Sequence, residues 1–196
     1  MATNPHSNRP LPEALSPVRA PELVFGLIAP IGVDLELVSS VLADTLREVR
    51  YGTHMLRLTA LMREMPIDLP LDATTYVESY RQRIAFANEV RRQFGDNSLA
   101  ALAVSAIRAF RAEEWQRRRS EKSSSQTFDV SQNSNRLDEE EPLPNQAYVI
   151  RQLKRPEEIV LLRGVYGKQF VLISAYAPAS WREERIKQSE NQTRGG

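Results

Sequence analysis

Four segments of the 196-residue chain have the pattern of buried or half-buried β-strands, and helical patterns separate them. The first segment, 23–28 (LVFGLI), is continuously apolar, which is typical of a strand buried on both faces of a parallel sheet. The other three are 53–58, 147–153 and 168–175. Strands that alternate with helices predict an α/β fold, in which a parallel sheet carries helices on both faces.

Between these strands, apolar residues recur at the spacing of three to four residues that marks one face of a helix. This periodicity predicts helices over residues 34–49, 73–94, 98–118 and 156–167, and Pro178 and Ala179 lead into a last predicted helix over 181–188 after the fourth strand. The expected order of elements is therefore β-α-β-α-α-β-α-β-α.

Three segments lack both patterns. Residues 1–20 are polar and proline-rich and predict a disordered leader, and residues 191–196 predict a disordered tail. Residues 120–145 are dominated by serine, glutamine, asparagine and acids, which predicts a flexible insertion. The remaining chain, 21–190, is long enough for one α/β domain with a real core.

Composition excludes several classes of function. The chain has 26 basic and 25 acidic residues, and this balance gives no general argument for nucleic-acid or membrane binding. It has no cysteine and two histidines, which excludes a disulfide framework, a thiolate zinc site and a histidine-rich metal site. No apolar run reaches the length of a membrane span and no signal sequence is visible, so we expect a soluble cytoplasmic protein.

The turn after the first strand is the first candidate for chemistry. Strand, glycine-containing turn and helix is the context in which helix-start amides bind phosphate. The turn departs from the Walker pattern, because Val33 stands at the position of the lysine and Asp34 at that of the Mg²⁺-binding hydroxyl. Two interpretations stay open: an ordinary turn that Asp34 caps, or a turn that still binds a nucleotide. The candidate binding residues are Gly26, Ala29, Pro30, Ile31, Gly32, Val33 and Asp34.

A second candidate group, Arg151, Lys154 and Arg155, follows the third predicted strand. The carboxyl ends of parallel strands meet at one edge of the sheet. If the first and third strands are neighbours, three cations converge on the mouth of the turn and could replace the missing Walker lysine. The alternative is that they only cover the edge of the sheet.

Three stretches together resemble one family, the bacterial anti-phage dCTP deaminases. The most recognisable stretch of that family is similar to RQLKRPEEIVLLRGVYGKQFVLISAYAP of this chain. The family's N-terminal P-loop turn is similar to ELVFGLIAPIGVDL, and its central helix pair is similar to FANEVRRQFGDNSLAALAVSAIRAFR. The resemblance covers about residues 22–186 without the insertion. Its matching positions are Gly26, Gly32, Asp34, Asn88, Arg91, Gly95, Arg151, Lys154, Arg155, Pro156, Glu157, Glu158, Arg163, Tyr166 and Gly167.

In that family, a domain like a P-loop nucleotide kinase precedes a zinc-dependent deaminase, which depletes dCTP during phage infection. The deaminase chemistry requires H-x-E and P-C-x-x-C motifs. This chain has neither motif, so the resemblance implies the P-loop kinase-like half alone, with zinc expected only in the absent deaminase domain. Ala29 stands where relatives often carry glycine, which gives the turn less backbone freedom.

The resemblance implies a nucleotide-binding or regulatory module of an antiviral system that does not deaminate by itself. It would bind a dNTP or ATP, with or without Mg²⁺, and pack on a deaminase domain or on its own copies. One alternative is a structural scaffold for oligomerisation, since a fifth strand of the kinase-type sheet is missing and leaves an edge open. Another is a deviant nucleotide kinase, in which Asp34 would hold Mg²⁺ and the three later cations would stabilise the transferred phosphoryl group.

Overall fold

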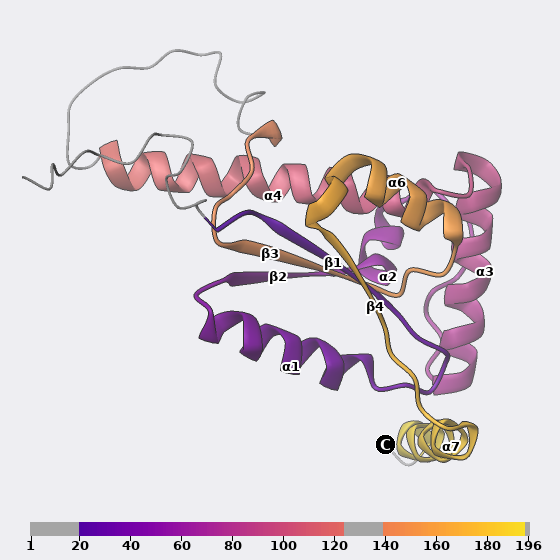
Figure 1. The fold of residues 1–196 in the computed structure, drawn as a ribbon. Coiled ribbons are helices and arrows are strands. Elements are labelled where there is room, and N and C mark those ends of the chain that lie inside the picture. The colour runs from indigo at the N-terminus through magenta and orange to yellow at the C-terminus, as the bar shows by residue number, and fades with distance from the viewer. Residues whose placement is uncertain (1–19, 124–138, 195–196) are drawn as a thin grey trace, which may run out of the picture.

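The computed structural model describes residues 20–123 and 139–194, and its centre is a four-stranded sheet in the order β2-β3-β1-β4. Every pairing in this sheet is parallel, which confirms the α/β class and the parallel sheet predicted from the sequence (Figure 1). The strands are β1 (Leu23–Ile28), β2 (Gly52–Arg57), β3 (Gln146–Arg151) and β4 (Phe170–Ser174).

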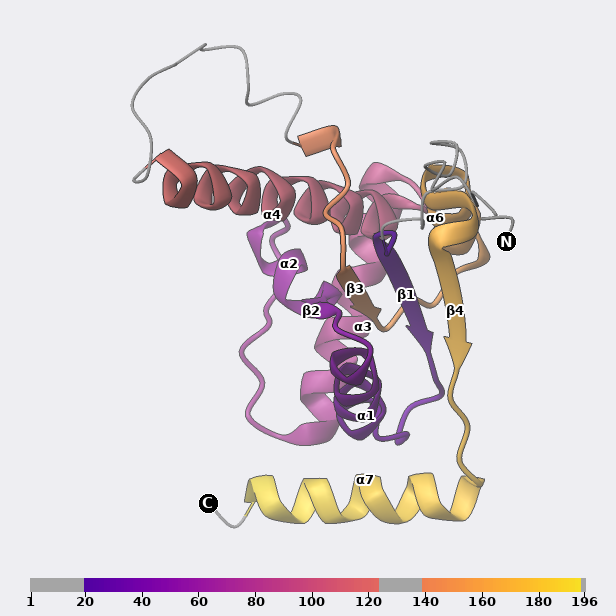
Figure 2. The ribbon, with the colours of Figure 1, turned by 60° about the vertical axis from the view of Figure 1, so that its left-hand side comes forward.

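Helices cover both faces of the sheet, but unequally (Figures 1 and 2). One face packs against α1, while α2, α3, α4 and α6 supply side chains to the core on the other face. The helices are α1 (Leu35–Glu48), α2 (Leu58–Leu61), α3 (Tyr76–Phe94), α4 (Ser98–Ser123), α6 (Pro156–Tyr166) and α7 (Ala179–Arg194), with the short 3₁₀ turns η2 (Met62–Glu64) and η3 (Gly167–Gln169).

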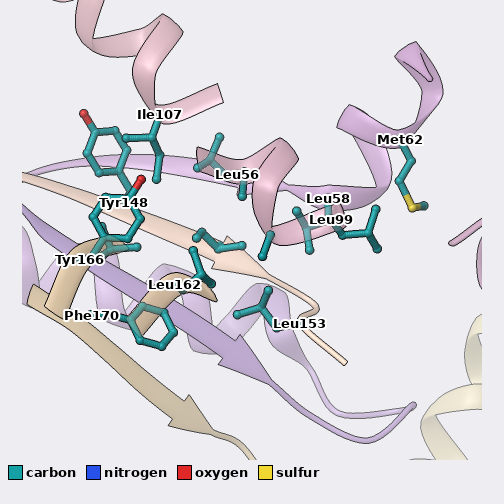
Figure 3. Close-up of a cluster of buried hydrophobic side chains, with 14 of the residues drawn as sticks. Leu56, Leu58, Met62, Leu99, Ile107, Tyr148, Leu153, Leu162, Tyr166 and Phe170 are labelled. Atoms are coloured by element: carbon teal, nitrogen blue, oxygen red, sulfur yellow. The ribbon is translucent and has the colours of Figure 1, made fainter. Parts of the chain in front are cut away.

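The two cores follow from the alternation of side chains along the central strands. Tyr148 and Ile150 of β3 enter the larger core with Ile107 of α4 and Leu162 of α6, as Figure 3 shows for several of these side chains. Val149, between them in sequence, enters the smaller core against α1. All three β3 residues are fully buried, because both faces of the strand are covered.

The structure corrects two of the predicted irregular segments. Helix α4 continues to Ser123, into the predicted insertion 120–145, and Leu143 near the end of that insertion is fully buried. Helix α7 continues to Arg194, so residues 191–194 are helical and not a disordered tail. Most of the predicted leader 1–20, the middle of the insertion (124–138) and residues 195–196 lie outside the described residues.

Both corrections have the same physical reason. The last turns of α4 and of α7 are strongly polar, so they show no apolar face that periodicity could reveal. In α4, Glu114 pairs with Arg117 and with Arg118, one helical turn further on. Such pairs stabilise a polar helix locally, which composition alone does not show.

Candidate functional site

The connections that follow β1 and β3 leave the sheet on opposite faces. The chain after β1 passes through α1 on one face to β2, whereas the chain after β3 passes through α6 on the other face to β4. β1 and β3 are direct neighbours, with Leu27 opposite Arg151. Adjacent strands with diverging connections open a crevice at their carboxyl ends, which is where open α/β sheets bind ligands.

A pocket of about 600 Å³ lies at this crevice, and we call it the switch pocket. Its volume is within the range of roughly 300–1,000 Å³ that small-molecule sites occupy. Part of its wall is apolar and aromatic, contributed by Leu58, Met62, Tyr76, Tyr80, Ile84 and Leu99. The rest is charged, contributed by Asp34, Glu36, Arg83, Arg91, Arg151, Lys154, Arg155 and Arg185.

Most of the residues predicted from the sequence line this pocket. They are Ala29, Pro30, Ile31, Val33, Asp34, Arg151, Lys154 and Arg155. The two predicted glycines are not among the lining residues. Gly26 lies inside β1, where an added Cβ would approach Leu153 Cδ1 to 2.7 Å, so this glycine permits close packing in the core. Gly32 faces α7, which is described below.

Asp34 caps the first helix. Its Oδ1 accepts a hydrogen bond from the Leu37 backbone N–H at 3.0 Å, and its Oδ2 forms an ion pair with Arg185 Nη2 of α7 at 2.7 Å. The capping interpretation of this residue is therefore confirmed. Both carboxylate oxygens have partners already, which leaves Asp34 poorly placed for the Mg²⁺ role that the kinase alternative needs.

Lys154 reaches from the end of β3 to the turn that follows β1. Its Nζ donates a hydrogen bond to the Ala29 carbonyl oxygen at 2.6 Å. Burial lowers the pKa of the Lys154 amine, the Glu158 carboxylate opposes this shift, and the Arg91 guanidinium adds to it. A cation from a later strand thus lies at the mouth of the turn, beside the position that lacks a Walker lysine.

Glu158 of α6 fixes the segment that carries Lys154 and Arg155. Its side chain is fully buried, and its Oε2 accepts from the backbone N–H of Lys154 at 2.7 Å and of Arg155 at 3.1 Å. Its Oε1 accepts from Arg91 Nη2 of α3 at 2.7 Å. Glu158 thus neutralises the buried Arg91 and also accepts from the amides at the start of α6. The segment that carries Lys154 and Arg155 is therefore held from within the core.

The remaining arginines of the pocket differ in their partners. Arg151 forms an ion pair with Glu36 at 2.6 Å, and this hydrogen bond is the main reason why the pKa of Glu36 lies below its usual value. Arg83 bonds to Ser79 Oγ and lies over the Tyr80 ring, 5.5 Å from its centre. Among the described residues, Arg83, Lys154 and Arg155 have no carboxylate ion-pair partner, so the pocket keeps an excess of positive charge.

Sequence reasoning missed the contribution of α3. Tyr76 and Tyr80 of that helix line the switch pocket with Arg83, and neither tyrosine was among the candidate site residues. Their rings lie 5.0 Å apart. Two tyrosines and an arginine at successive helical turns are a signal that could have been found, because such a stripe combines aromatic surface with polar tips.

Neither a protein-family model nor a curated protein matches the chain. Within the described ranges, no three His, Cys, Asp or Glu side chains gather as a metal site would require, and no helix has the length and apolar character to cross a bilayer. The switch pocket can hold an anionic group on its cations while an apolar ring lies against Tyr76 and Tyr80.

Proposed function

We propose that the chain is a nucleotide-binding module whose site is the switch pocket. The observation that supports this most directly is the contact between Lys154 Nζ and the Ala29 carbonyl at 2.6 Å. Arg155 lines the same pocket and has no ion-pair partner in the described part of the chain. A phosphate would accept charge-assisted hydrogen bonds from both side chains. The base would lie against Tyr76 and Tyr80 on the opposite wall.

The fold offers further support for a P-loop kinase-like domain. Strand β1, the turn 29–34 and α1 follow each other as in a phosphate-binding unit, and the cations of β3 lie at the same edge of the sheet. On the resemblance of residues 151–178, we further propose that the module serves a dCTP deaminase partner in defence against phage. It would do so in the cytoplasm, without deaminating by itself.

The proposal is tested by calorimetric titration of the full chain with ATP, dCTP and dCMP, each with and without Mg²⁺. Reversing the charge of Arg155 (Arg155→Glu) should weaken nucleotide binding at least about tenfold, because a phosphate would then face a carboxylate. Arg163→Glu is the matched control, since Arg163 is an exposed arginine of α6, the helix that Arg155 precedes, and does not line the pocket.

Two outcomes would contradict the proposal. One is the absence of binding heat with every nucleotide while the chain is folded. The other is an Arg155→Glu variant that binds as tightly as the native chain and the Arg163→Glu control.

A scaffold for oligomerisation is the second candidate, and one surface favours it. Strand β4 has a neighbour on one side only among the described residues, and Val171 on this strand is 40% exposed. Val160 and Val165 of α6, which packs on β4, are 70% and 50% exposed. An open strand edge next to exposed valines is a surface on which another chain could pair. A stable oligomer that Val171→Lys dissociates, together with no nucleotide binding, would favour this function.

A further inference from the structure

Helix α7 lies beyond the carboxyl ends of the strands and spans from the turn after β1 to the start of α3 (Figure 2). Near its first turns, Arg182 Nη1 donates to the Ile31 carbonyl at 3.3 Å, and Arg185 pairs with Asp34. Near its end, Glu190 Oε2 accepts from the Val77 backbone N–H at 2.9 Å. Thr193 Oγ1 accepts from the Tyr76 N–H at 3.3 Å. Both ends of α7 therefore touch residues next to or within the wall of the switch pocket.

These contacts are polar, and α7 contributes little to the core. None of its described side chains, 179–193, is buried, and Trp181 is 73% exposed. Half-exposed ion pairs and hydrogen bonds contribute little each, roughly 0–1 kcal/mol for an ion pair. A helix held in this way opens at a small free-energy cost compared with the elements of the core.

The backbone of α7 fills the space beside the glycine of the turn. Gly32 has φ +88°, and a Cβ added to it would lie 2.7 Å from the Arg182 carbonyl oxygen. One amide at the start of α1 is also engaged, because Asp34 accepts from the Leu37 N–H, and Arg185 neutralises the charge of Asp34. The position where a helix start binds a phosphate is thus occupied by groups of the protein itself.

We infer that α7 is a strap that restricts the switch pocket to a nucleotide with a single phosphate. The inference rests on the proposed function. One phosphate on Lys154 and Arg155 needs no change at the turn. A second and third phosphate that continue along the turn meet the Arg182 carbonyl of α7, so they bind only when α7 moves away.

The far end of the strap provides the test, because Glu190 and Thr193 are remote from the turn in the helix and do not line the pocket. The variant Glu190→Ala with Thr193→Val removes the two hydrogen bonds to α3 named above and changes no residue at the turn. Glu183→Ala is the matched control, since it removes the same charge from an exposed position of α7. Hydrogen exchange of residues 179–194 reports whether the strap is released.

Calorimetry of the full chains with AMP, ADP, ATP, dCMP, dCDP and dCTP then measures the preference for monophosphates over triphosphates. In the native chain and the Glu183→Ala control, we expect the monophosphate to bind at least about tenfold more tightly than the triphosphate of the same nucleoside. In the double variant, hydrogen exchange of α7 should be faster. The triphosphate should gain at least about fivefold in affinity while the monophosphate stays within about twofold.

Three results would overturn the inference. The native chain could bind triphosphates as tightly as monophosphates, α7 could exchange equally fast in the double variant and the native chain, or α7 could be released without any change in the preference. The absence of binding for every nucleotide in all chains is a different result, because it refutes the proposed function itself.

Discussion

The turns that follow β1 and β3 lie at the same edge of the sheet and are built from similar parts, yet they are held in opposite ways. In each turn, a carboxylate accepts from at least one backbone amide near a helix start and pairs with an arginine. Asp34 pairs with Arg185 of the outlying helix α7, and both side chains are partly exposed, at 29% and 46%. Glu158 pairs with Arg91 of α3, and these side chains are 0% and 6% exposed.

The difference teaches which side of the switch pocket is fixed and which side can adjust. The turn after β3 is anchored by a buried pair inside the core, so the backbone that carries Lys154 and Arg155 has one position. The turn after β1 is closed from outside by polar contacts of α7, which solvent weakens. One turn therefore has a backbone that the core holds in place, and the other can exchange its covering helix for a ligand.

The largest expected effect comes from breaking the buried pair. Glu158→Ala leaves the Arg91 charge buried without a partner, so we expect a loss of about 3–5 kcal/mol in the free energy of unfolding, measured with urea. Asp44→Ala is the control, because Asp44 pairs with Arg47 on the surface, with side chains 59% and 75% exposed, and it should change stability little. If the two variants were equally stable, the turn after β3 would not be anchored as described.

A smaller effect is expected at the turn after β1. Gly32→Ala places a Cβ at φ +88° and against the Arg182 carbonyl, so we expect a loss of about 1–2 kcal/mol in the free energy of unfolding and faster hydrogen exchange of α7. Gly164→Ala is the matched change in α6, where an added Cβ meets nothing within 4 Å. That control should gain up to about 1 kcal/mol from its higher helix propensity. A change of the same sign in both variants would contradict this contrast.

The smallest effect is a pH dependence that comes from Lys154. Because burial lowers the pKa of its amine, Lys154 loses its charge at a lower pH than an ordinary lysine, and nucleotide affinity should fall as pH rises through that lowered pKa. The free energy of unfolding changes in the opposite direction. Between the lowered pKa and the usual one, the unfolded chain binds more protons than the folded chain, so the folded state becomes more stable as pH rises.

Calorimetry between about pH 7 and 10 measures the change in affinity, because an ordinary lysine titrates near pH 10.4. Lys154→Arg keeps its charge throughout this range and should remove the decline. A decline that persists unchanged in Lys154→Arg would assign the titration to another group.

The sequence predicted the strands and most helices, and the reason lies in particular residues. The continuous apolar runs of β1 and β3 are both buried on two faces, and Pro156 begins α6 as a proline at the first helical position should. The ends of α4 and α7 could not be predicted, because their polar residues leave no apolar period. The pocket wall formed by Tyr76 and Tyr80 was not predicted, since helical periodicity identifies one face of α3 but does not show whether that face meets the core or a pocket.

By itself, the sequence determined what depends on neighbours along the chain: the strand, the turn with its capping Asp34, and the helix after it. The tertiary structure alone decided that β3 lies beside β1, that Lys154 reaches Ala29, and that Glu158 meets an arginine 67 residues away. The physical reason is that strand order follows from how the apolar faces of whole helices are buried against the sheet. No local pattern in the sequence determines the strand order. The position of α7 beside Gly32 likewise depends on the tertiary structure.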